Sequence, residues 1–439
     1  MHGWELATVG AILLGYAAVS GWLQRSPISA AMVFVTFGYV VGNHGFGLIS
    51  GASARESERL LAEATLTLLL FADAARIDLR VLRREYALPA RLLGVGLPLT
   101  IVAGAVAAAV MFGDLTLPEA AVLGVLLAPT DAALGQAVVT DLRLPSRIRQ
   151  GLNVESGLND GICVPLLFIA LGFAEADSNT ASASGAARLI SEAIGYGCLA
   201  GVIAGGLAAI LLTQGRRHGL TAEVAVPVIP VAAAALAYGI ATPLGGSGFI
   251  AAFVGGLVYG GIVSNEHGTD SLLAEEIGSI LDGATFVVFG AAILGPALSV
   301  LDWRVALYAV LSLTVVRMVP VWLAMAGMHA RPPTIAYVGW FGPRGLASIV
   351  FALILVEGSH LPGTPTILAV TFFTVALSVF AHGLTAPALT DRYAGWFRSH
   401  PADGAPPMES VYVPHQRWRR GRRPAAAALA GTSAPRGAA

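Results

Sequence analysis

Two apolar stretches of the sequence contain polar and acidic residues of the types that bind a small cation. Proline lacks a backbone N–H and clashes with the preceding turn, so Pro129 should interrupt the first stretch and leave carbonyl oxygens free. Carboxylate, hydroxyl and amide oxygens are the ligands that a hard cation prefers. One ionised side chain in hydrocarbon costs about 2.5–3.5 kcal/mol, so a cluster of them favours a binding site over ties between helices. The candidate ligands are Thr130, Asp131, Ser156, Asn159 and Asp160, with Asp131 and Asp160 as the anionic pair.

The second stretch should be one helix that carries its polar residues in two adjacent stripes. Residues four apart on a helix share a face. Ser156 should therefore lie over Asp160, and Glu155 over Asn159.

A later apolar stretch is interrupted in the same way, at Gly342–Gly345, where the residues are Gly-Pro-Arg-Gly. This second break lies seven stretches after the first, as expected for two inverted six-helix repeats with the site between their crossed broken helices. Arg344 in the break and Arg317 in the preceding stretch both need an anionic partner. Glu155 is the carboxylate not assigned to the cation, so we interpret it as half of a structural ion pair with one of these arginines.

The elements that must position these residues are membrane-spanning helices. The 439 residues are 56% hydrophobic and 12% charged, whereas an average soluble domain is about 25% charged, so a soluble enzyme is excluded. Blocks of about 20 apolar residues predict helices rather than the short alternating strands of a barrel. About 13 spans are predicted, near residues 5–23, 28–42, 58–77, 89–111, 118–140, 150–174, 190–213, 223–240, 247–264, 273–295, 304–326, 333–357 and 365–388.

The predicted loops differ in charge on alternate sides of the membrane. Every basic residue is an arginine, and one set of loops collects them whereas the other set is acidic. Cytoplasmic loops are typically the positive ones. We therefore expect an extracellular N-terminus, a cytoplasmic C-terminus and a location in the cell inner (plasma) membrane, in contact with membrane lipid.

Composition also argues against several partners and cofactors. A net charge of −1 argues against a nucleic-acid partner. Cys163 and Cys198 lie in apolar blocks and are expected to be core residues rather than a disulfide. The histidines lack the spacing of zinc ligands, so no resident metal or other cofactor is expected. Ser247, within a run of glycines, fits a tight loop better than a protease nucleophile, so no enzyme is predicted.

Two regions of different composition are predicted. Residues 1–390 form the transmembrane domain, and residues 391–439 form a basic, Ala/Pro-rich cytoplasmic tail. The tail lacks periodic apolar residues and should be disordered. Its arginines at 419–423 could contact anionic lipid.

Other charges in the spans have less definite roles. Near the end of the third span we expect a local ion pair among Asp73, Arg76 and Asp78. In the tenth span, Asp282 and Glu276 could line the cytoplasmic funnel or cap a helix. Glycines at positions 197, 201 and 205 permit close helix packing within the chain, with a dimer contact as the alternative.

The residues quoted above resemble the NhaP/NHE-type monovalent cation:proton antiporters. The resemblance rests on Thr130–Asp131, on the run Glu155–Gly161 and on Pro343–Gly345, and the segment Leu68–Asp78 is similar to that family's third helix. It covers residues 5–390. The chain departs from the family pattern at Gly157, where leucine is common, and at Ala132–Ala133.

The resemblance implies a 13-helix NhaA-like antiporter fold, a homodimer, an elevator-like movement of a core domain and secondary active exchange of Na⁺ or Li⁺ for H⁺. By position, Asp160 binds the cation and the proton, and Asp131, Thr130, Ser156 and Asn159 complete or support the site. Asn159 stands where electrogenic relatives have a first aspartate, which implies electroneutral one-for-one exchange.

Competition of a proton and a cation for one buried carboxylate would give the exchange, because an empty charged site is costly to move through hydrocarbon. We expect a role in pH and sodium homeostasis. A K⁺/H⁺ antiporter and a cation channel are the alternatives.

Overall fold

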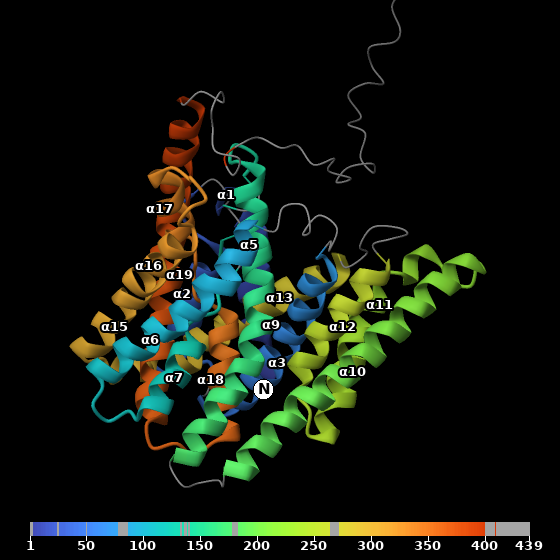
Figure 1. The fold of residues 1–439 in the computed structure, drawn as a ribbon, viewed down its shortest axis with the longest axis horizontal. Helices are drawn as coiled ribbons and strands as arrows, with labels where there is room; N and C mark the ends of the chain where they lie inside the picture. The colour runs from blue at the N-terminus through green and yellow to red at the C-terminus, as the bar shows by residue number, and fades with distance from the viewer. Residues whose placement is uncertain are drawn as a thin grey trace, which may run out of the picture.

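The computed structural model is all-helical over the residues that it describes, with no strand among them (Figure 1). It describes residues 3–23, 26–49, 51–77, 87–131, 134–135, 138, 141–177, 183–263, 272–399 and 409. The predicted all-α class is confirmed. Asp78, Ala132, Ala133 and the arginines at 419–423 lie outside the described residues.

Long apolar helices make up most of the described chain. Seven of them are long and apolar enough to cross a membrane. In chain order they are α1 (Gly3–Leu23); the continuous run of α5 (Ala87–Arg91), η1 (Leu92–Gly96) and α6 (Leu97–Met111); α9 (Ser146–Asp177); α10 (Ala183–Arg217); the run of α13 (Leu272–Val288), η4 (Phe289–Leu294) and α14 (Gly295–Ser299); α15 (Trp303–Leu313) with α16 (Val315–Ala324); and α19 (Thr364–Ser399).

The remaining helices complete the bundle and include both halves of the second broken helix. They are α2 (Ala30–Val41), α3 (Gly51–Ala75), α7 (Leu117–Leu126), η2 (Glu223–Ala225), α11 (Val228–Ala241), η3 (Thr242–Leu244), α12 (Gly248–Val263), α17 (Pro332–Trp340) and α18 (Leu346–Gly358). Each of the 13 apolar stretches contains described helix. The number of membrane crossings and the inverted repeats stay predictions.

Local sequence signals begin several of these helices. The Thr116 hydroxyl accepts a hydrogen bond from the Glu119 N–H, and the Glu119 carboxylate accepts one from the Thr116 N–H, which forms a capping box at α7. Ser29 caps α2 through the Met32 N–H, and Asp302 caps α15. These caps fix where the helices start.

Close packing through glycine joins α10 to α12 at one flank of the molecule, with α11 beside them (Figure 1). A Cβ atom at Gly201 would lie 2.5 Å from the carbonyl oxygen of Ala251, and one at Gly197 would lie 2.9 Å from that of Ser247. Intramolecular packing is therefore confirmed for this glycine run. The glycine face of α10 is covered by α12, and a dimer contact by this helix stays a prediction.

α19 continues past residue 390, where composition placed the end of the membrane domain, and runs to Ser399. Tyr393 and Ala394 are buried in these last turns, and the Tyr393 ring stacks on Tyr337 with centroids 4.4 Å apart. A few aromatic residues thus give this segment an apolar face that its average composition hides. Further along, Glu409 is also buried.

Candidate cation site

The first chain break follows α7. After Leu126 the backbone leaves the helix and runs through Ala128–Asp131 without regular structure. The N–H of Asp131 donates to the carbonyl oxygen of Pro343 at 2.8 Å, so this break crosses the second one directly. The predicted crossing of the two interrupted segments is therefore present.

The Asp131 carboxylate lies at the start of α18. Its Oδ2 accepts a hydrogen bond from the Leu346 N–H at 3.1 Å, and its Oδ1 accepts one from the Leu134 N–H at 3.4 Å. An anion at the first turn of a helix is stabilised by the unpaired N–H groups and the helix dipole. A Cβ atom at Gly345 would overlap Asp131 Oδ2, so this contact requires glycine in the second break.

Arg344 occupies the opposite end of the crossing. Its guanidinium is fully buried, and Nη1 donates to the carbonyl oxygens of Ala128 and Pro129 at 3.0 and 3.1 Å. The Ser348 hydroxyl donates to the carbonyl oxygen of Leu126 at 2.7 Å. These donors satisfy carbonyl groups that the end of α7 leaves unpaired.

Glu155 pairs with the other arginine. Arg317 Nη1 and Nη2 donate to the two Glu155 carboxylate oxygens at 2.6 and 2.9 Å, and both residues are 2% exposed. This bidentate contact joins α9 to α16. Of the two arginines considered for Glu155, Arg317 therefore makes the ion pair, whereas Arg344 binds backbone carbonyls instead.

The neutral candidate ligands form a hydrogen-bonded group between the first break and α9. The Thr130 and Ser156 hydroxyls lie 3.0 Å apart, and Asn159 Nδ2 donates to the Thr130 hydroxyl at 2.7 Å. This arrangement leaves Asn159 Oδ1 buried without a donor among the described residues, and Asp160 Oδ1 is in the same position. Two neighbouring residues thus present buried oxygens that no group in the described part of the chain satisfies.

Further acidic groups surround Asp160. Asp131 and Asp73 are the carboxylates near enough to interact with it electrostatically. Asp73 on α3 lies against Gly157, where a Cβ atom would be 3.2 Å from the Asp73 Cβ. A larger side chain at 157 would therefore crowd Asp73. At Gly161 a Cβ atom would overlap the ring of Phe253 from α12.

For Asp282 the sequence left two roles open, a funnel lining and a helix cap. Asp282 lies inside α13, so the helix-cap alternative is wrong for it. The residue is 8% exposed, its Oδ1 has no hydrogen-bond partner among the described residues, and Asp131 is close enough to interact with it. Its central position in an apolar span was the available signal. Glu276, in the same helix, is exposed.

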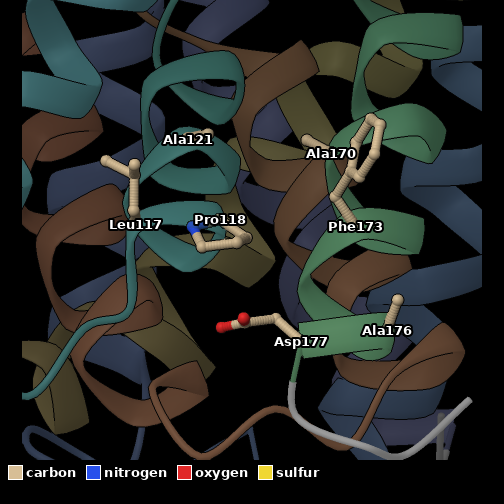
Figure 2. A pocket seen from close by; sticks show the side chains of 7 residues that line it. All are labelled: Leu117, Pro118, Ala121, Ala170, Phe173, Ala176 and Asp177. Atoms are coloured by element: carbon tan, nitrogen blue, oxygen red, sulfur yellow. The ribbon is translucent and has the colours of Figure 1, made fainter.

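A cavity of about 500 Å³ lies between the start of α7 and the end of α9 (Figure 2). Its lining is largely apolar, and Asp177 is its one charged residue. None of the candidate cation ligands lines it. The cavity is therefore separate from the crossing.

Comparisons with known proteins agree with this geometry. Residues 9–392 match the sequence model of a protein family, described as "Sodium/hydrogen exchanger, transmembrane". This chain belongs to the sodium/hydrogen exchanger family. The resemblance to NhaP/NHE-type proteins is thereby confirmed, and the family consists of transporters rather than enzymes.

The similar proteins are named as antiporters for two different cations, Na⁺ and K⁺. The chain is 28% identical to the Na⁺/H⁺ antiporter NhaP of Pseudomonas aeruginosa, over 75% of this chain and 80% of that protein. It is 26% identical to the K⁺/H⁺ antiporter NhaP2 of Shewanella sp. strain MR-4, over 85% of this chain. It is 25% identical to the Na⁺/H⁺ antiporter 2 of Zygosaccharomyces rouxii, over 81% of this chain. The chain spans 64% and 48% of the length of the latter two.

A solved structure shows the same fold. The sodium proton antiporter MjNhaP1 of Methanocaldococcus jannaschii superposes with a TM-score of 0.72 at 21% identity, covering 89% of this chain and 98% of that one. The match supports the antiporter fold for the membrane helices.

Proposed function

We propose that the protein is a secondary active antiporter that exchanges a monovalent cation for H⁺. The observation that carries this proposal is the pair of unsatisfied buried oxygens on Asn159 and Asp160, beside the crossed chain breaks. A buried acceptor without a donor is costly. A proton on the Asp160 carboxylate removes part of that cost, and a bound cation removes it from both residues.

The site residues divide into ligands and supports. Asp160 is the carboxylate for which cation and proton compete, and Asn159 Oδ1 is the neighbouring ligand. Thr130 and Ser156 hold Asn159 in place. Asp131 adds negative charge and secures the start of α18.

Competition at one carboxylate couples the two fluxes. An ionised, empty site would have to carry its charge through a low-dielectric region, which costs several kcal/mol. Either H⁺ or the cation neutralises the site and allows it to change sides. Leak without exchange is thereby suppressed.

The charges at the crossing favour electroneutral exchange. Asn159, beside Asp160, is neutral, and Asp160 is the one carboxylate that we assign to the exchange, so the exchanging group carries one negative charge. One monovalent cation or one proton cancels it, so both loaded forms carry the same charge. One-for-one exchange follows.

Na⁺ or Li⁺ is the proposed substrate, with K⁺ as the alternative because relatives of similar identity carry both names. A channel would have no need of a single titratable carboxylate between two breaks. We further propose a homodimer in the plasma membrane, with the N-terminus outside and the C-terminus in the cytoplasm, that serves pH and sodium homeostasis.

The test is cation-dependent proton movement in everted vesicles from an antiporter-deficient host. Na⁺, Li⁺ and K⁺ are added in turn to vesicles that contain a pH-sensitive dye, for the parent chain and for Asp160→Asn. Glu223→Gln is the control, since the Glu223 side chain is 79% exposed and pairs with Arg216, which is not among the candidate site residues. We expect dye dequenching that only Asp160→Asn lacks. Substantial exchange by Asp160→Asn, at equal expression, would refute the assignment.

Asp131→Asn tests the division of roles. It should raise the cation concentration for half-maximal transport but retain some exchange, because it leaves the Asp160 carboxylate intact. An unchanged concentration would contradict the role given to Asp131.

A further inference from the structure

Glu409 lies at the first turn of α17. Its Oε1 accepts hydrogen bonds from the Arg331 N–H at 2.9 Å and from the Thr334 hydroxyl at 2.8 Å. Its Oε2 lies 3.4 Å from Arg331 Nη1. Glu409 is 1% exposed, so this is a buried and highly specific contact.

At this end of α17 the Thr334 and Ile335 N–H groups already donate to the Arg331 carbonyl oxygen, so Glu409 binds the Arg331 N–H instead. The N-cap residue is Arg331, whose side chain makes no capping hydrogen bond, and Pro332 and Pro333 follow it. These prolines have no backbone N–H, which leaves the Arg331 N–H as the donor that needs a partner outside the helix. The Glu409 carboxylate supplies both the acceptor and the negative charge that favours a helix N-terminus.

α17 also lies along a polar stripe of α19. The hydroxyls of Thr334 and Tyr393 are 2.9 Å apart, and those of Tyr337 and Thr390 are 3.0 Å apart. At the other end of α17, the Trp340 carbonyl oxygen is 3.0 Å from His382 Nε2, the Trp340 indole donates to Thr385 at 3.0 Å, and the Arg344 N–H donates to Ser378 at 2.7 Å. The contact at Glu409 therefore continues a row of bonds that ends at the second break.

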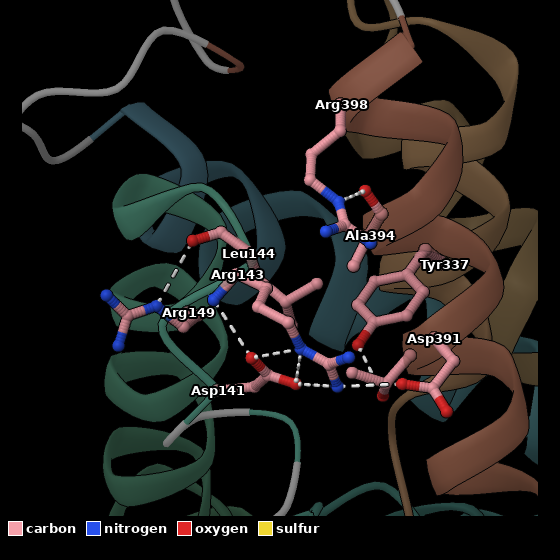
Figure 3. A network of polar contacts seen from close by, with 9 residues as sticks. Asp141, Arg143, Leu144, Arg149, Tyr337, Asp391, Ala394 and Arg398 are labelled. Atoms are coloured by element: carbon pink, nitrogen blue, oxygen red, sulfur yellow. Dashed lines mark hydrogen bonds and ion pairs between the residues drawn. The ribbon is translucent and has the colours of Figure 1, made fainter.

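A second tie reaches α19 from the chain that follows the first break. Arg143 bridges Asp141 at 2.6 Å and Asp391 at 2.8 Å (Figure 3). The hydrogen bond from Arg143 holds the pKa of Asp141 below its ordinary value, so the bridge stays ionised at neutral pH. The last turns of α19 thus contact the segments that follow the first break and precede the second.

We propose that Glu409 is a positioning residue of the cation site. It caps α17, and α17 is only nine residues, about 13 Å, long. Its far end leads into the break whose Pro343 carbonyl and Leu346 N–H hold Asp131. Fixing the first turn of α17 therefore fixes the geometry around Asp131. The effect on transport rests on the proposed function, whereas the docking of Glu409 does not.

The docking is tested by hydrogen exchange on the full chain in detergent. In Glu409→Ala the backbone amides of Arg331 and of residues 334–337 should exchange at least about tenfold faster, as expected for loss of a charge-assisted hydrogen bond. Glu223→Gln is the matched control and should leave this segment unchanged. Equal exchange in Glu409→Ala and the parent chain would overturn the docking.

Transport in the same vesicle assay tests the positioning role. Glu409→Ala should raise the half-saturating cation concentration severalfold and leave the maximal rate within about twofold of the parent chain. Glu409→Asp, which retains the charge, should be less affected, and added formate should partly restore Glu409→Ala by occupying the vacated cap.

A fall in maximal rate alone, or a defect that neither Glu409→Asp nor formate relieves, would overturn the positioning role. If the parent chain moves no protons with any cation while residues 331–337 still depend on Glu409, the proposed function fails and the docking stands.

Discussion

Removing one partner of the Glu155–Arg317 pair should destabilise the protein strongly. Both residues are 2% exposed, and two hydrogen bonds of 2.6 and 2.9 Å join them. Glu155→Gln keeps the volume of the side chain but leaves the Arg317 charge buried without a counter-charge. Breaking a buried pair in this way costs about 3–5 kcal/mol. We expect a free energy of unfolding lower by that amount, and reduced yield.

The assay is unfolding of the detergent-purified protein followed by tryptophan fluorescence. The double variant Glu155→Leu/Arg317→Met removes both charges and should recover most of the lost stability, because an apolar pair of similar volume has no buried charge to solvate. Glu223→Gln changes a carboxylate that is 79% exposed and pairs with Arg216, so it should unfold nearly like the parent chain. The reasoning fails if Glu155→Gln is as stable as Glu223→Gln, or if the double variant is no more stable than the single one.

Three further predictions concern the crossing and its surroundings. Gly345→Ala should abolish exchange, because the new methyl group overlaps Asp131 Oδ2; normal transport in vesicles would contradict this contact. Thr130→Val removes the hydrogen-bond partner of both Ser156 and Asn159. At about 1 kcal/mol per hydrogen bond, this change should raise the half-saturating cation concentration by roughly tenfold or more. An unchanged concentration would show that Asn159 needs no support. Because the pKa of Asp141 is lowered, its bridge to Arg143 stabilises the fold above the ordinary aspartate range and is lost only as the pH falls through the lowered value. Arg143→Gln should therefore leave the pH profile of transport unshifted between about pH 6 and 9, and a shifted profile would place a sensor at this bridge.

Hydropathy and residue chemistry predicted much of this architecture. The apolar blocks of about 20 residues mark the helices because each must satisfy its own backbone in hydrocarbon. Both breaks were visible because proline and glycine are poor in helix interiors. Thr130, Ser156 and Asn159 were candidates because they are polar residues within two apolar stretches, whereas helical spacing placed only Ser156 over Asp160 and Glu155 over Asn159.

Other features depend on contacts between distant parts of the chain. Spacing could not decide whether Arg317 or Arg344 faces Glu155, because both lie in later helices whose rotation is set by packing. The end of α19 was placed too early because average composition hides the few aromatic residues, such as Tyr393, that bury its last turns. The burial of Glu409 had no sequence signal, since its partners Arg331 and Thr334 lie more than 70 residues away.

The ring of Phe253 over Gly161 sets a condition on any sliding of α9 along α12. The ring fills the space that a Cβ atom would need one residue after Asp160. In this position it would block sliding of α9 along α12 unless the ring itself moved. Packed interfaces of this kind have discrete arrangements rather than a continuum of positions. Movement of α9 must first withdraw the ring and then seat it elsewhere, so the site should pass between its end states in one step.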